Sequence, residues 1–162
     1  MTFTDGTIVH AADLNALLSP GRVFTTQATV QSGITTATWS DIILNGTPAT
    51  DTKAACSGAA NVVIGKVIGW WLVSGVVTWV GNATGTTRRA RVALNGTPIN
   101  GSFSTTGPLA TRVSVATPTV LVQASVGTDA VTLQGYHDAT TSIAPEVTNE
   151  VRCSLTAVYI GP

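Results

Sequence analysis

Turn signals recur at short intervals along most of this chain, and they leave room between them only for short strands. From Arg22 onward, stretches rich in Val, Ile, Thr and aromatic residues alternate with turns that contain Gly, Pro or Asn. Two of these turns share the sequence Asn-Gly-Thr-Pro, at 45–48 and 95–98. Asn-Gly favours a β-hairpin because both residues tolerate a positive φ. Turn signals about every 8 to 12 residues are typical of a sandwich or barrel, so the sequence predicts an all-β domain.

Glycine-containing turns set the limits of the individual strands. Ser74-Gly75 is expected to separate two apolar strands, and Gly127-Thr128-Asp129 to turn the chain between two others. The predicted strands are 23–30, 38–44, 66–73, 76–80, 89–94, 99–104, 110–116, 120–125, 130–136 and 151–160.

The composition supports β structure and indicates self-association. Thr and Val are abundant, and branching at Cβ suits the pleated, half-buried surface of a sheet. Charged residues make up only 10% of the chain and the formal net charge is zero, whereas an average soluble domain has roughly 25% charged residues. A surface with few charges repels other copies of the protein only weakly, so a free monomer is poorly protected from association. We therefore expect an oligomer; a monomer kept soluble by Thr, Ser and Asn is the alternative.

Residues 1–20 differ from the rest and are predicted to form an attachment arm, followed by a β domain at 21–162. The segment 10–18 has helical character, because Leu14, Leu17 and Leu18 share one face and Ser19-Pro20 ends it. So short a helix is marginal alone, so its leucines must pack on the domain or on another protein. The arm's predicted apolar contacts are Phe3, Val9, Leu14, Leu17 and Leu18.

Charge and hydropathy argue against nucleic acid and membrane as partners. The densest basic run is Arg88, Arg89 and Arg91. In a strand, Arg89 and Arg91 would share a face and Arg88 would point the other way. Three arginines on one strand more often form salt bridges or an oligomer contact than bind in a groove of a nucleic acid. The longest apolar stretch, 62–80, is interrupted by Lys66 and glycines, and the N-terminus has no basic and apolar signal pattern.

The cysteines lack the spacing of a metal or redox motif. Cys56 and Cys153 lie far apart in the sequence. Two buried free thiols are expected if the protein assembles in a reducing cytoplasm, and a single disulfide is the alternative.

No pattern of catalytic or metal-binding residues is evident. His137 could act as a general base that is oriented by the carboxylate of Asp138. Neighbouring residues in a strand point to opposite faces, however, so the two side chains would not form a hydrogen bond there. A surface or loop role is therefore predicted for His137. Asp129 and Asp138 flank one predicted strand, and turn formation is favoured there over calcium binding. We predict a protein that is not an enzyme, with no cofactor and no metal.

Aromatic residues are the candidate core and interface side chains. Trp70 and Trp71 should face opposite sides of their sheet, one in the core and one toward solvent or a partner. A sugar-stacking role is the alternative for an exposed tryptophan. The candidates for core or trimer interface are Trp39, Trp70, Trp71, Trp79 and Tyr159.

Two resemblances to known families follow from these segments. Residues 3–7 (Phe-Thr-Asp-Gly-Thr) and 11–15 (Ala-Ala-Asp-Leu-Asn) resemble the N-termini of tailed-bacteriophage virion proteins, which attach such proteins to the particle. The body resembles the jelly-roll of the C1q and tumour-necrosis-factor superfamily. The similarity rests on 69–77, on 88–96, which resembles R-x-x-x-L-x-x-N-G, on 126–133, which resembles G-D-x-V-x-L, and on the final strand around 159–161. Thr128, between Gly and Asp, departs from that pattern.

The resemblances imply a fold, an assembly and a location. Superfamily members are usually trimers with apolar and aromatic side chains along the three-fold axis. The expected protein is a trimeric jelly-roll β-sandwich that decorates and stabilises a phage capsid. Its partners would be its own copies and the major capsid protein or another virion protein, on the virion surface after assembly in the host cytoplasm. The alternative is a tail-fibre or receptor-binding module for a host surface glycan or protein.

Overall fold

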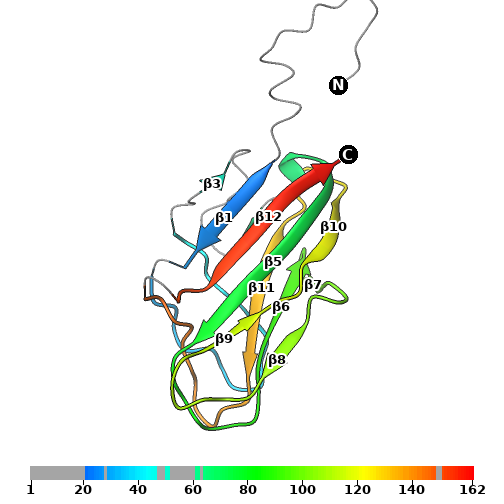
Figure 1. The fold of residues 1–162 in the computed structure, drawn as a ribbon. Helices are drawn as coiled ribbons and strands as arrows, with labels where there is room; N and C mark the ends of the chain where they lie inside the picture. Colours follow the sequence, from blue (N-terminus) through cyan, green and yellow to red (C-terminus); the bar gives the residue numbers. More distant parts are fainter. Residues whose placement is uncertain (1–20, 28, 47–49, 52–60, 63, 149–150) are drawn as a thin grey trace, which may run out of the picture.

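The computed structural model describes residues 21–27, 29–46, 50–51, 61–62, 64–148 and 151–162. The described chain forms two antiparallel sheets that pack face to face (Figure 1). The predicted arm, with Phe3, Val9, Leu14, Leu17, Leu18 and the helix at 10–18, lies outside the described residues, as does Cys56.

The sheet nearer the viewer in Figure 1, called here the front sheet, is built around the longest strand. Its strands are β1 (Arg22–Thr26), β3 (Thr50–Asp51), β5 (Gly69–Trp79), β9 (Val113–Ala116), β10 (Val120–Ala124) and β12 (Ser154–Gly161). Their order is β10-β5-β12-β1-β3, and β9 also pairs with β5. The first described strand, β1, lies beside the last, β12.

The second sheet, called here the back sheet, is centred on β11 and β6. Its strands are β2 (Ser40–Asp41), β4 (Asn61–Val62), β6 (Arg88–Leu94), β7 (Thr97–Pro98), β8 (Ser104–Thr106) and β11 (Val131–His137). The order is β2-β11-β6-β7, with β4 also on β11 and β8 also on β6. A 3-10 turn, η1 (Ile64–Lys66), precedes β5. No helix in the described residues is long and apolar enough to span a bilayer.

Alternating side chains of both sheets form the core. In β1, β9 and β10 every second residue is buried, as expected for strands with one face on the core. The buried aliphatic and aromatic residues form one continuous cluster between the sheets, which includes Val23, Ile42, Trp71, Val73, Val77, Trp79, Val92, Leu133 and Leu155. The prediction of an all-β sandwich is confirmed.

The prediction of a strand break at Ser74-Gly75 is wrong. β5 runs through both residues, and Gly75 pairs with Leu155 of β12. A Cβ on Gly75 would lie 2.7 Å from Cδ1 of Leu133. Glycine is therefore needed here for close packing between the sheets and not for a turn.

The two Asn-Gly motifs behave differently. Asn95 and Gly96 have φ of 49° and 78°, and they connect β6 to β7 as the predicted hairpin. Asn45 is not in a positive φ conformation; its side chain accepts a hydrogen bond from the Thr29 N–H at 3.3 Å. The strand that follows, β3, pairs with β1. The predicted hairpin at 45–46 is therefore wrong, because side-chain hydrogen bonding holds Asn45 instead.

The predicted strand at 99–104 is also displaced. The chain pairs at Thr97–Pro98 and Ser104–Thr106 and turns between them, where the buried Ser102 hydroxyl donates to the Ile99 carbonyl at 2.7 Å.

Cys153 is a free thiol in the core, as predicted for it. Its sulfur accepts a hydrogen bond from the Thr78 N–H at 3.3 Å, and burial raises its pKa to about 12.

Candidate interaction surfaces

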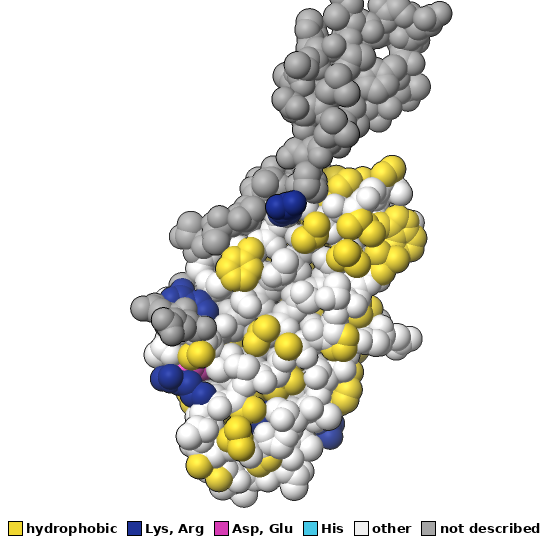
Figure 2. Space-filling model, viewed as in Figure 1, with side chains coloured by type: hydrophobic (Ala, Val, Ile, Leu, Met, Phe, Trp, Pro, Cys, Tyr) yellow, Lys and Arg dark blue, Asp and Glu magenta, His cyan; other side chains and the backbone are white. Residues whose placement is uncertain are grey.

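The outer face of the front sheet is apolar at one end. Cross-strand pairing aligns Leu121 of β10, Leu72 of β5 and Val158 of β12. Trp70 lies two residues before Leu72 on β5 and therefore on the same face of the sheet. Leu121 is 51% exposed, Leu72 38% and Ile160 52%. Figure 2 shows hydrophobic side chains gathered over this end of the sheet, at the upper right. We call the set Trp70, Leu72, Leu121, Val158 and Ile160 the front patch.

Charged side chains are almost absent from the outward positions of the strands in this sheet. The outward positions of β5, β9, β10 and β12 are occupied by Ser, Thr, Gln, Ala and larger apolar residues, and β1 adds Phe24 and Arg22. Among these described outward side chains, Arg22 is the one that is charged. A contiguous apolar area without charge favours contact with another protein surface over exposure to water.

The predicted opposition of Trp70 and Trp71 is confirmed. Trp70 lies on the outer face and is partly exposed, whereas Trp71 is fully buried and donates its Nε1–H to the Val67 carbonyl at 3.0 Å. The ring of Tyr159 meets Trp71 edge-on, with 5.4 Å between ring centroids. Trp79 is also fully buried. Of the predicted aromatic candidates, Trp71 and Trp79 therefore belong to the core and Tyr159 packs on it.

Trp39 belongs to neither the core nor the front patch. It lies just before β2, on the outer face of the back sheet, with the Arg91 guanidinium carbon 3.9 Å from its ring centroid. Trp39 also contacts Tyr136 and Phe103, with ring centroids 5.4 and 6.3 Å away.

A second arginine completes this group. The guanidinium carbon of Arg89 lies 4.8 Å from the Tyr136 ring centroid and 5.8 Å from that of Phe103. Arg89 and Arg91 thus share the outer face of β6, as predicted, while Arg88 is fully buried. We call Trp39, Arg89, Arg91, Phe103 and Tyr136 the back cluster. The sequence pattern placed the two arginines on one face, but it contained no signal for the three aromatic residues that meet them.

Polar contacts anchor one arginine of the back cluster. Arg91 donates from Nε to Oε1 of Gln134 at 2.8 Å, and Gln134 donates from Nε2 to Oδ1 of Asp41 at 2.8 Å. Desolvation lowers the pKa of Arg91, and the charge of Asp41 partly opposes this. Arg91 is therefore fixed by a chain of hydrogen bonds that ends in a carboxylate.

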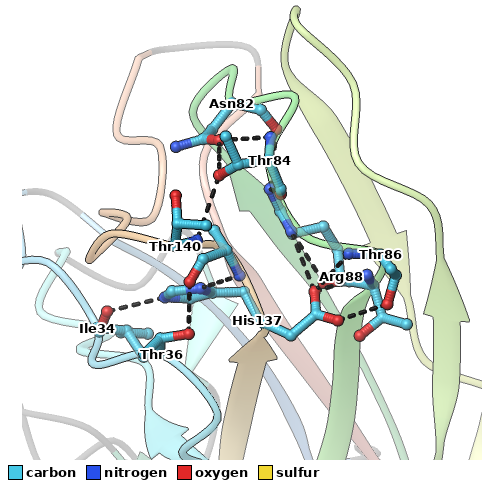
Figure 3. A network of polar contacts seen from close by, with 11 residues as sticks. Ile34, Thr36, Asn82, Thr84, Thr86, Arg88, His137 and Thr140 are labelled. Carbon is cyan, nitrogen blue, oxygen red and sulfur yellow. Dashed lines mark hydrogen bonds and ion pairs between the residues drawn. The ribbon is translucent and has the colours of Figure 1, made fainter.

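His137 is a buried structural residue, which corrects the prediction of a surface or loop histidine. It is the last residue of β11 and points into the core, where Trp79 meets its ring edge-on. Its Nε2 lies 2.8 Å from the Ile34 carbonyl, and its Nδ1 accepts the Ala139 N–H at 3.2 Å (Figure 3). This pairing requires the neutral form with the proton on Nε2, and burial lowers the pKa of His137. Both ring nitrogens of His137 are therefore engaged in hydrogen bonds to backbone groups, the Ile34 carbonyl and the Ala139 N–H.

Asp138 points away from His137 and binds a different loop. Its carboxylate accepts hydrogen bonds from the Thr86 N–H at 2.8 Å and the Thr87 N–H at 2.7 Å. Burial alone would raise the pKa of Asp138, but the hydrogen bonds from Thr86 and Thr87 outweigh it and lower the pKa to about 2. Arg88 lies 3.8 Å away and donates to the carbonyls of Asn82 and Thr84. Figure 3 shows this network closing the end of the sandwich.

Asp129 has a turn-forming role, as predicted. Its carboxylate accepts hydrogen bonds from the Val126 N–H, the Asn95 amide and the Ser125 N–H, and these contacts lower its pKa. Asp129 and Asp138 lie beyond opposite ends of β11 and do not converge. In the described part of the chain, no three His, Cys, Asp or Glu side chains come together as metal ligands would.

Comparison with solved structures identifies the fold. Murine APRIL at pH 5.0 matches with a TM-score of 0.63 and 11% identity, over 87% of this chain and 99% of that one. The globular domain of zebrafish complement 1qA matches with a TM-score of 0.60 and 10% identity, over 87% and 98%. The vertex protein P5 of phage PRD1 matches with a TM-score of 0.60 and 14% identity, over 87% and 97%. The predicted jelly-roll of the C1q and tumour-necrosis-factor type is confirmed.

These similarities establish the fold alone. No family model matches the chain, and no curated protein matches it in sequence.

Proposed function

We propose that this chain is a structural protein of a tailed-phage virion that associates with itself as a homotrimer through the front patch. The apolar, nearly uncharged outer face of the front sheet carries the proposal, because that area would be covered in an oligomer. The similarity to a phage vertex protein supports a place on a virus particle.

Attachment is assigned to residues 1–20. Their resemblance to phage N-terminal segments supports this role, and three arms on one trimer would bind together with a high effective concentration. The trimer would decorate and stabilise the capsid surface after assembly in the host cytoplasm. In this role the chain is not an enzyme, and the use of His137 and Asp138 in holding loops is consistent with that.

Light scattering tests the assembly directly. A trimer has a mass near 50 kDa, three times 16.5 kDa. A monodisperse monomer at micromolar concentration would disprove the self-association.

Particle binding tests the location. Full-length protein should bind particles that lack it, and a variant without residues 1–20 should remain trimeric but fail to bind. Immunogold label on the head agrees with capsid decoration, and label confined to the tail tip excludes it. The second candidate, a receptor-binding module, is favoured by one observation, the exposed Phe103 ring beside the half-buried arginines of the back cluster.

A further inference from the structure

We propose that the back cluster binds a carboxylate-bearing sugar, the repeating unit of an acidic polysaccharide. The inference deepens the second candidate function and rests on it, and it is independent of the front patch because the cluster lies on the opposite face of the sandwich.

The first argument is an uncompensated positive charge. The cluster holds two guanidinium groups, and Asp41 is the carboxylate that acts on Arg91. Asp138 pairs with Arg88 and Glu146 with Arg112, and among the described residues no carboxylate forms an ion pair with Arg89. Its Nε is buried without a hydrogen-bond acceptor. A ligand carboxylate would supply the missing negative charge, and a guanidinium binds a carboxylate with two parallel hydrogen bonds.

The second argument is that Arg89 is already held in position. Tyr136 and Phe103 both contact its guanidinium, and Tyr136 is its cross-strand partner on β11. A fixed guanidinium loses little conformational freedom on binding, which favours affinity.

The third argument is an exposed aromatic platform beside the charge. Phe103 is 48% exposed although its ring lies beside the Trp39 ring and the Arg89 guanidinium. An exposed ring of this kind can pack against the apolar C–H face of a pyranose. Thr105 pairs with Arg89 across β6 and β8, so its exposed hydroxyl lies on the same face. Cation, aromatic ring and hydroxyl together match the carboxylate, C–H face and hydroxyl groups of one acidic sugar.

The same observations disfavour other ligand classes. Nucleic acid binding requires clustered Lys and Arg that neutralise several phosphates, and this site has one uncompensated cation. An extended peptide would need an apolar groove or an accessible strand edge, and the cluster is built on the face of the back sheet around two arginines.

Isothermal titration of full-length protein tests the proposal with defined probes. Trigalacturonate, sialyllactose and a hyaluronan tetrasaccharide would each be titrated as the free acid and as the neutral methyl ester. We expect at least one acid to bind at millimolar concentration or below, and its ester to bind about tenfold more weakly or worse, as for loss of a charged hydrogen-bond pair. Absence of binding by all three acids, or equal binding of acid and ester, overturns the proposal.

Matched variants locate the binding. Arg89→Gln should weaken binding about tenfold and Phe103→Ala severalfold, at unchanged melting temperature. Arg22→Gln removes the same charge from the front sheet, and Phe24→Ala removes a ring that is 38% exposed there; both should bind like the parent. Equal weakening by Arg22→Gln would show a nonspecific charge effect and overturn the assignment.

Two further titrations address the competing classes. Tighter binding of hexaglutamate or of a thymidine decanucleotide at the same residues would also overturn the assignment to a sugar. The mass of every variant is measured in parallel, so failure of sugar binding and failure of self-association are separate results.

Discussion

Replacing Leu121 with lysine should dissociate the trimer without unfolding the subunit. Leu121 is 51% exposed on β10 and pairs with Leu72, which is 38% exposed. Complete burial of a leucine side chain contributes about 1.5–3 kcal/mol, so covering the exposed half contributes about 1 kcal/mol per copy. Three copies then contribute about 3 kcal/mol, or roughly two orders of magnitude in the overall association constant. Because trimer dissociation depends on the square of concentration, the midpoint moves about tenfold.

The lysine adds a second penalty. Its ammonium group would be desolvated in the trimer contact, where the described outward side chains of β1, β5, β9, β10 and β12 include no carboxylate, and an unpaired buried charge costs several kcal/mol. We therefore expect Leu121→Lys to be a folded monomer at micromolar concentration while the parent is a trimer.

Light scattering over a dilution series measures the effect, with circular dichroism to verify folding. Leu109→Lys is the matched control, because Leu109 is 52% exposed and lies in the connection between β8 and β9. The reasoning is refuted if folded Leu121→Lys keeps the mass of the parent, or if Leu109→Lys dissociates to the same extent.

Three predictions concern the subunit itself. Trp71→Ala should reduce the free energy of unfolding by about 3–5 kcal/mol, because the indole is fully buried, and Trp70→Ala by much less; urea denaturation measures both. Asp138→Asn should cost about 1 kcal/mol at pH 7, since solvent screens this partly exposed carboxylate. Its folded-state pKa of about 2 lies below the ordinary 3.8, so the difference from the parent should be full above pH 4 and vanish as pH falls toward 2. In a Cys56→Ser variant, Cys153 should react with a thiol reagent at pH 8 only after urea is added, because burial raises its pKa to about 12.

Local patterns predicted the sandwich and the direction of many side chains. Two neighbouring residues in a strand must face opposite sides, so the opposition of Trp70 and Trp71 followed from the sequence alone. The same rule separated Arg88 from Arg89 and Arg91. These predictions needed only the strand period, and no knowledge of which strands pair.

Features that depend on packing between distant segments could not be predicted. Gly75 looks like a turn residue until Leu133 of the other sheet is placed against it. The back cluster depends on the register of β6 with β11, which brings Arg89 opposite Tyr136, and on Trp39 and Phe103 reaching that face from outside these strands. The strand period separates His137 from Asp138 but does not show that His137 faces the core, where the Ile34 carbonyl lies 2.8 Å from its Nε2.

The two faces of the sandwich differ in charge, and this difference separates the two proposed roles. The described outward side chains of β1, β5, β9, β10 and β12 include one charge, Arg22, and the front patch is apolar, so this face suits permanent contact with a second copy. The back face holds two guanidinium groups stacked on aromatic rings, so it suits a polar ligand that is bound and released. If the front patch assembles three subunits, three weak sugar sites act on one polymer, and their combined affinity exceeds that of a single site without any new contact. Leu121→Lys should therefore weaken binding to a long acidic polysaccharide and leave binding to a single short oligosaccharide unchanged, whereas Arg89→Gln should weaken both.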